Sequence, residues 1–182
     1  MEVATHIDHS TSRPTGRHRA AGKAAPLYTP EQRARRDASA WTLVQGVLAP
    51  LQFAVCLVST VLIVRTLHTG EGAGVAHASV LLKTALLLAI MVTGSIWEKV
   101  VFDRWLFAPA FFWEDVVSFG VIALHVAYVA ALFGGWLDGG ALLALALVAY
   151  SAYAINAAQF VLKLRAARRG TGAPVQGDGV TA

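Results

Sequence analysis

Carboxyl groups and aromatic rings are concentrated in residues 97–115 of the 182-residue chain. This segment holds four carboxylates, two cations and seven aromatic side chains among nineteen residues. Three of the carboxyls, Glu98, Glu114 and Asp115, lie where long apolar stretches end or begin. A carboxyl that turns into an apolar interior is partly removed from water and can donate a proton near neutral pH. The pattern predicts general acid–base chemistry beside aromatic surfaces on which a flat ligand could stack.

The same segment also has a simpler interpretation. Aromatic residues anchor interfacial loops of membrane proteins, and neighbouring charges such as Asp103 and Arg104 can form local ion pairs. The position of the three carboxyls at the ends of apolar stretches favours the catalytic interpretation.

Further polar side chains recur inside the apolar stretches at helical spacing, about 100° per residue. These stripes consist of Gln45, Gln52, Cys56 and Ser59, of Asp115, Ser118, Ile122 and His125, and of Tyr153, Asn156, Gln159 and Lys163. We expect them to face one another in a bundle interior, because polar groups facing lipid are costly. The amides either hold helices together or bind polar groups of a ligand. Lys83 either extends to the membrane surface or pairs with a carboxylate that the sequence does not identify.

His125 lies near the middle of the third apolar stretch. Three interpretations remain open: a neutral, hydrogen-bonded histidine, an axial ligand of a tetrapyrrole metal, or a proton donor or acceptor. A haem held by two histidines is disfavoured, because no second histidine lies as deep in an apolar stretch. Cys56 is the single cysteine, which excludes an internal disulfide or a cysteine metal cluster.

Four long apolar stretches must position these side chains. Hydrophobic residues make up 56% of the chain and charged residues 14%, well below the roughly 25% charged of ordinary soluble domains. Each stretch meets the requirement of about 20 residues for a bilayer crossing. We predict spans at about residues 41–67, 76–102, 113–133 and 141–164. The expected fold is an all-α, polytopic, antiparallel bundle of four transmembrane helices within residues 27–167.

The two ends of the chain are polar and basic. Residues 1–26 and 168–182 are predicted to be disordered tails, and residues 29–32 read as a capped helix start. Of the 15 Lys and Arg residues, seven precede Trp41 and four follow Leu162. The positive-inside rule therefore predicts that both termini are cytoplasmic. Anionic lipid and topology account for this charge, so we expect no nucleic-acid partner.

Several strings of residues carry a family resemblance. They are residues 27–37, 41–53, 91–102 (MVTGSIWEKVVF), 106–115 (LFAPAFFWED), 156–160 and 163–165. Together they closely resemble the 3-vinyl (2-vinyl) bacteriochlorophyllide hydratase family over about residues 27–168. The resemblance implies a hydro-lyase of bacteriochlorophyll biosynthesis in phototrophic bacteria. It would add water to the 3-vinyl group of chlorophyllide a or of a 3-vinyl bacteriochlorophyllide, giving a 3-(1-hydroxyethyl) group.

Such a reaction needs a proton donor, a group that orients or deprotonates water, and an apolar clamp for the ring. We expect Glu98 or Asp115 as the acid, and the other of the two or Glu114 as the base. His125 is expected to bind the substrate's magnesium or to position water. No cofactor and no separate metal site are expected, because the magnesium arrives with the substrate. The candidate substrate-binding residues are Gln45, Gln52, Trp97, Trp113, Asn156 and Gln159.

The resemblance also implies partners and a location. The partners are a magnesium tetrapyrrole and the lipid bilayer, and association with other pigment-biosynthesis enzymes or with a second copy is left open. The location is the bacterial inner membrane, cytoplasmic or intracytoplasmic. An alternative function is a non-enzymatic tetrapyrrole-binding or pigment-assembly subunit, and another is a structural subunit of a larger membrane complex. Turnover, rather than stoichiometric pigment binding, would distinguish the hydratase from both.

Overall fold

The fold is entirely helical over residues 27–170, the part of the chain that the computed structural model describes. The helices are α1 (Pro30–Ala38), α2 (Ala40–Thr69), α3 (Ala73–Phe102), α4 (Phe112–Gly134) and α5 (Gly139–Gly170). The all-α prediction is confirmed for this region. The tail predicted at residues 1–26 lies outside the described residues, as do residues 171–182 of the second predicted tail.

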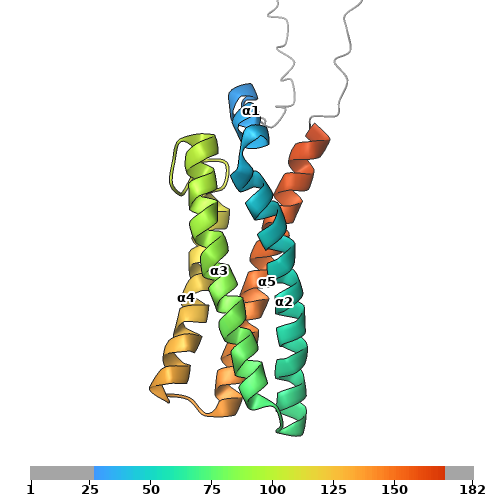
Figure 1. The fold of residues 1–182 in the computed structure, drawn as a ribbon, viewed down its shortest axis with the longest axis vertical. Helices are drawn as coiled ribbons and strands as arrows, with labels where there is room; N and C mark the ends of the chain where they lie inside the picture. The colour runs from blue at the N-terminus through green and yellow to red at the C-terminus, as the bar shows by residue number, and fades with distance from the viewer. Residues whose placement is uncertain (1–26, 171–182) are drawn as a thin grey trace, which may run out of the picture.

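Helices α2 to α5 are each long and apolar enough to cross a membrane, and Figure 1 shows them side by side as a bundle. They contain the four predicted spans and extend a few residues beyond them. The largest difference is at α5, which runs to Gly170 although its span was predicted to end near residue 164. Apolar side chains such as Leu43 and Val61 are exposed on the outside of the bundle, where lipid would cover them. The chain is therefore a polytopic membrane protein.

The bundle consists of two helical hairpins. α2 packs mainly against α3 and α4 mainly against α5, with less contact between the two pairs. Glycines with positive φ form the hairpin turns, at Gly70 and Gly72 in one and at Gly135 in the other, because glycine adopts this conformation without steric cost. Both turns lie at one end of the bundle, whereas α1, the α3–α4 connector and the end of α5 lie at the other (Figure 1).

The short helix α1 begins at the predicted cap. The Gln32 backbone N–H donates to the Thr29 hydroxyl (3.2 Å), and the Thr29 N–H donates to the Gln32 side chain (2.9 Å). Pro30 occupies the first turn, where its missing N–H costs nothing. The predicted capping box is therefore confirmed, and α1, which it begins, packs against α3.

The polar stripes face the bundle interior with one exception. Gln52, Ser59, His125 and Asn156 are all buried, which is the arrangement expected for polar groups in a membrane bundle. Gln159 is exposed instead. It lies at the edge of its predicted stripe, and the packing of α5 leaves that edge uncovered.

Candidate active site

The connector between α3 and α4, residues 103–111, folds back over the helix ends. Asp103 and Phe107 both have positive φ, 60° and 58°. A bulky residue in this conformation costs roughly 1–3 kcal/mol, and such strain is concentrated at functional sites. Here the strained turn directs two successive backbone N–H groups, those of Phe107 and Ala108, toward carboxyl groups on α3 and α4.

Those carboxyls form a buried pair. Ala108 N donates to Glu98 Oε2 (3.1 Å) and Phe107 N donates to Asp115 Oδ2 (2.8 Å), and each residue is only 5% exposed. The two side chains also interact with each other. Because two ionised carboxylates at close range repel each other, the pair favours holding one proton between its two members. The pair can therefore donate a proton from one member and accept one at the other.

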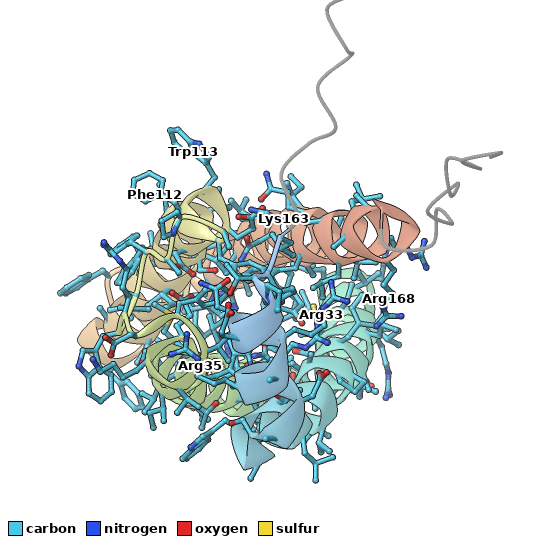
Figure 2. The ribbon with its side chains drawn as sticks, turned by 90° about the horizontal axis from the view of Figure 1, so that it is seen from above. Arg33, Arg35, Phe112, Trp113, Lys163 and Arg168 are labelled. Atoms are coloured by element: carbon cyan, nitrogen blue, oxygen red, sulfur yellow. The ribbon has the colours of Figure 1, made fainter. Side chains whose placement is uncertain are left out.

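Glu114, the neighbouring carboxyl, has a different partner. Its Oε2 lies 2.6 Å from Nζ of Lys163 on α5, and that ammonium group also lies 5.2 Å from the Phe111 ring centre. Figure 2 shows Lys163 among the helix ends, whereas Phe112 and Trp113 point away from the bundle. The ion pair connects α4 to α5.

We expect Lys163→Met to destabilise the protein, because it leaves the buried Glu114 carboxylate without its cation. The loss should be about 1–3 kcal/mol of unfolding free energy, measured by thermal or denaturant unfolding in detergent. The double variant Lys163→Met with Glu114→Gln should recover much of the loss. Purely additive effects of the two substitutions would contradict the proposed coupling.

An aromatic cluster packs beside the carboxyl pair. It consists of Tyr28, Trp97, Phe102, Phe111 and Phe160. Trp97, expected to bind substrate, is used here in packing, with its ring edge-on to two phenylalanines and its Nε1–H donating to Thr42 (2.9 Å). Trp113, the other predicted aromatic contact, is 71% exposed and lies on the outside of α4. Substrate binding by Trp97 and Trp113 stays a prediction.

Two buried side chains deeper in the bundle each have an atom without a hydrogen-bond partner in the described region. Asn156 donates to Ser118 (2.7 Å), but its Oδ1 has no donor. His125 Nδ1 lies 2.8 Å from the Val121 carbonyl oxygen, and its Nε2 has no partner although the residue is only 1% exposed. Because a carbonyl only accepts, Nδ1 carries the proton and Nε2 keeps a free lone pair. Both atoms are suited to a ligand or to water.

The remaining predicted amides join α2 to α3. Gln45 donates to Thr93 (2.8 Å), and Gln52 donates to the Leu86 carbonyl (3.3 Å) while accepting from Lys83. These bonds correspond to the interhelical role that the sequence left open for Gln45 and Gln52.

Some features of the site could not be found from the sequence. The backbone donors of Phe107 and Ala108 depend on the path of the connector, which has no local signature. The expected ion pair of Asp103 with Arg104 is wrong: Asp103 pairs with Lys99 at 2.6 Å. These two residues are four apart at a helix end, where such side chains meet, and Lys99 lowers the pKa of the Asp103 carboxyl from its ordinary value.

The comparisons with known proteins cover most of the residues that the structure describes. A sequence model of the 2-vinyl bacteriochlorophyllide hydratase family matches residues 28–166. The 2-vinyl bacteriochlorophyllide hydratase of Cereibacter sphaeroides is 65% identical over 142 residues, which cover 78% of this chain and 88% of that relative. The protein of the same name from Rhodobacter capsulatus is also 65% identical over 142 residues, covering 78% and 82%. No solved structure matches the chain significantly.

The matched residues include the connector, the buried carboxyl pair, the helices α2 to α4 and most of α5. The chain belongs to the 2-vinyl bacteriochlorophyllide hydratase family.

Proposed function

We propose that this protein adds water to the 3-vinyl group of chlorophyllide a or of a 3-vinyl bacteriochlorophyllide, in bacteriochlorophyll biosynthesis. The names of its relatives indicate the substrate class and the reaction. The observation that carries the proposal is the buried Glu98–Asp115 pair, held by consecutive backbone N–H groups. Addition of water needs one proton donor and one proton acceptor, and this pair supplies both.

The reaction begins with protonation of the vinyl group. The protonated carboxyl of the pair transfers its proton to the terminal vinyl carbon, and the π electrons of the double bond form the new C–H bond. The inner carbon becomes a cation that the macrocycle delocalises. The oxygen of a water molecule then bonds to that carbon, and the other carboxylate takes the proton that water loses. The pair ends with one proton, as it began, and no oxidant or reductant takes part.

Two neighbouring groups, Glu114 and Asn156, differ from the pair in their partners. Glu114 forms an ion pair with Lys163, so we assign acid and base to Glu98 and Asp115 rather than to Glu114. Asn156 lies beside Ser118, one helical turn from Asp115 along α4. Its free Oδ1 accepts a hydrogen bond from the attacking water.

His125 is proposed as the ligand of the substrate's magnesium. Its Nε2 lone pair is free, and the bond from Nδ1 to the Val121 carbonyl fixes the required tautomer. His125 lies ten residues from Asp115, about 15 Å along α4 at 1.5 Å per residue. Magnesium belongs to the substrate, and the proposed chemistry needs no further cofactor.

Aromatic side chains on the outside of α4 offer a route for the ring system. Phe107 stacks on Phe119 (ring centres 5.5 Å apart) and also contacts Phe112 (5.7 Å). These rings are partly exposed beside the connector. A flat apolar ring dissolved in the bilayer can stack on this surface before it reaches the carboxyl pair.

We place the protein in the bacterial inner membrane, with both termini in the cytoplasm. Arg33 and Arg35 of α1 and Lys163 of α5 lie at the connector end of the bundle (Figure 2). The hairpin turns at the opposite end carry little positive charge, with Arg65 near one of them. This charge distribution agrees with the positive-inside rule.

The test is a conversion assay with the purified full chain in lipid nanodiscs and chlorophyllide a, without nucleotide or reductant. We expect a product heavier by one water, with label from H2¹⁸O in its hydroxyl group. In D2O, one deuterium should appear on the new methyl group, because the terminal carbon receives the proton. Stoichiometric pigment binding without conversion would refute the hydratase and favour a pigment carrier.

A further inference from the structure

Arg104 of the connector is a cation without a partner in the part of the chain that the structure describes. Its side chain is exposed, and the salt bridges and cation–ring contacts of residues 27–170 join other residues. Two other cations at this end of the bundle have carboxylate partners, since Lys99 pairs with Asp103 and Lys163 pairs with Glu114. Arg104 is therefore available to bind an anion from outside the chain.

An exposed aromatic surface, formed by Phe107, Phe112 and Phe119, begins three residues after Arg104. Phe107 stacks on Phe119 with ring planes 16° apart and also contacts Phe112, which points away from the bundle (Figure 2). Phe107 is 37% exposed and the other two rings 43% each. Three residues of extended chain span at most about 10 Å. Arg104 therefore lies at the edge of the aromatic surface.

Phe107 also connects the aromatic surface to the carboxyl pair. Its ring lies on the outside of the bundle, whereas its backbone N–H donates to Asp115 Oδ2 at 2.8 Å. The positive φ of Phe107 is one that glycine would adopt without steric cost, yet a large apolar ring stands at this position. A flat ligand stacked on that ring would lie close to a carboxyl of the pair.

A chlorophyllide has two features that this arrangement can bind. Its macrocycle is flat and apolar, which suits stacking on aromatic rings. Its free propionate is an anion, and a guanidinium binds a carboxylate through two parallel hydrogen bonds. The propionate and the 3-vinyl group are on neighbouring rings of the macrocycle. With the propionate at Arg104, the vinyl group would therefore lie near Phe107, beside the carboxyl pair.

We infer that Arg104 and the aromatic surface form the docking site at which a free-acid tetrapyrrole is taken from the membrane, an inference that rests on the proposed function. The macrocycle stacks on Phe107 and Phe119 within the lipid, and the propionate stays with Arg104 at the boundary with water. Trp105 and Trp113, 60% and 71% exposed, agree with this level, because exposed tryptophans are enriched at membrane–water boundaries. Arg104 is thus a binding residue that favours free-acid tetrapyrroles over their esters.

The test of Arg104 compares chlorophyllide a with its propionate methyl ester, which lacks the negative charge. Binding to the full chain in phosphatidylcholine nanodiscs is followed by quenching of tryptophan fluorescence. Because the ester partitions more strongly into lipid, the quantity compared between variants is the ratio of acid affinity to ester affinity. Arg104→Gln should lower this ratio about 3- to 10-fold, as expected for a charge-assisted pair that stays close to water.

Arg165→Gln is the matched control, because Arg165 is an exposed arginine near the end of α5, and it should leave the ratio unchanged. An unchanged ratio in Arg104→Gln would overturn the inference. An equal loss of affinity for acid and ester would overturn it as well. An arginine that binds lipid headgroups, or that only supports the fold of the connector, does not distinguish the two ligands.

Phe119→Leu tests the aromatic surface. It keeps an apolar side chain in the lipid and removes the ring on which Phe107 stacks. Both ligands should bind about 2- to 10-fold more weakly with the ratio unchanged, since stacking does not depend on the propionate charge. Phe133→Leu, at the far end of the same helix and 76% exposed, is the control and should bind as the wild type does. Unchanged affinity in Phe119→Leu would contradict docking on this surface.

The docking site and the proposed catalysis can fail separately, because the first is measured by binding and the second by conversion. A protein with an Arg104-dependent preference for the acid that does not convert chlorophyllide a would refute the hydratase alone. A protein that hydrates chlorophyllide a, but whose ratio is unchanged in Arg104→Gln, would refute the docking site alone.

Discussion

Glu98→Gln and Asp115→Asn should each lower the rate of vinyl hydration by about 100- to 10,000-fold, the usual contribution of a general acid or base. Each substitution keeps the shape of the side chain and removes its ability to exchange a proton. The loss should appear mainly in kcat, because the pair acts on the reacting carbons rather than on the body of the ring. The measurement is steady-state conversion of chlorophyllide a by protein in nanodiscs, with pigment binding checked in parallel.

The double variant distinguishes a shared proton from two independent contributions. If the two carboxyls act as a unit, Glu98→Gln with Asp115→Asn should be little slower than the slower single variant. Asp103→Asn is the control, because Asp103 is an exposed carboxyl of the same connector, and its activity should be near that of the wild type. Full activity in both single variants would refute this site without changing the family to which the chain belongs.

His125→Ala should weaken binding of chlorophyllide a by about 10- to 100-fold, in the range seen when a metal site is disturbed. The cause is loss of the Nε2 lone pair that we assign to the substrate's magnesium. The matching metal-free ligand, pheophorbide a, has no metal for the histidine to bind. Its affinity should therefore differ little between the variant and the wild type. Fluorescence quenching measures both ligands under the same conditions.

Comparing the two ligands distinguishes a loss of magnesium coordination from a loss of packing in the bundle. His125 also packs against Tyr150, with ring centres 5.8 Å apart, so removal of the imidazole could disturb the bundle by itself. Such a disturbance would weaken binding of both pigments equally and would contradict coordination. His68→Ala, at an exposed position near the end of α2, is the matched control and should bind both pigments as the wild type does.

Much of the fold follows from local properties of the sequence. The spans depend on length and hydropathy, and the start of α1 depends on the spacing of Thr29, Pro30 and Gln32. Each signal lies within one segment, so no knowledge of the other helices is needed to detect it. The burial of Gln52, Ser59 and His125 also followed from helical spacing, since a polar stripe in a membrane span must face other protein groups.

What the sequence could not predict concerns side chains whose surroundings depend on more than one helix. Gln159 lies at the edge of its predicted stripe, and only the packing of α5 decides that this edge is exposed. Trp97 and Trp113 are both tryptophans at helix ends, yet one packs within the aromatic cluster and the other lies outside α4. Helical spacing gives the angle of a residue, but it does not say which angles a neighbouring helix covers.

The class of protein, its four membrane helices, its family, and the presence of Glu98, Glu114 and Asp115 at the ends of spans all follow from the sequence. Which of these carboxyls meet depends on how the helices pack in three dimensions. The tertiary structure pairs Glu98 with Asp115 and assigns Glu114 to Lys163, from a helix about fifty residues further along the chain. It also brings two backbone N–H groups to the pair and leaves Lys83 without a carboxylate among the described residues. The physical reason is that partners in a bundle are set by the packing and rotation of whole helices, whereas the sequence reports on one helix at a time.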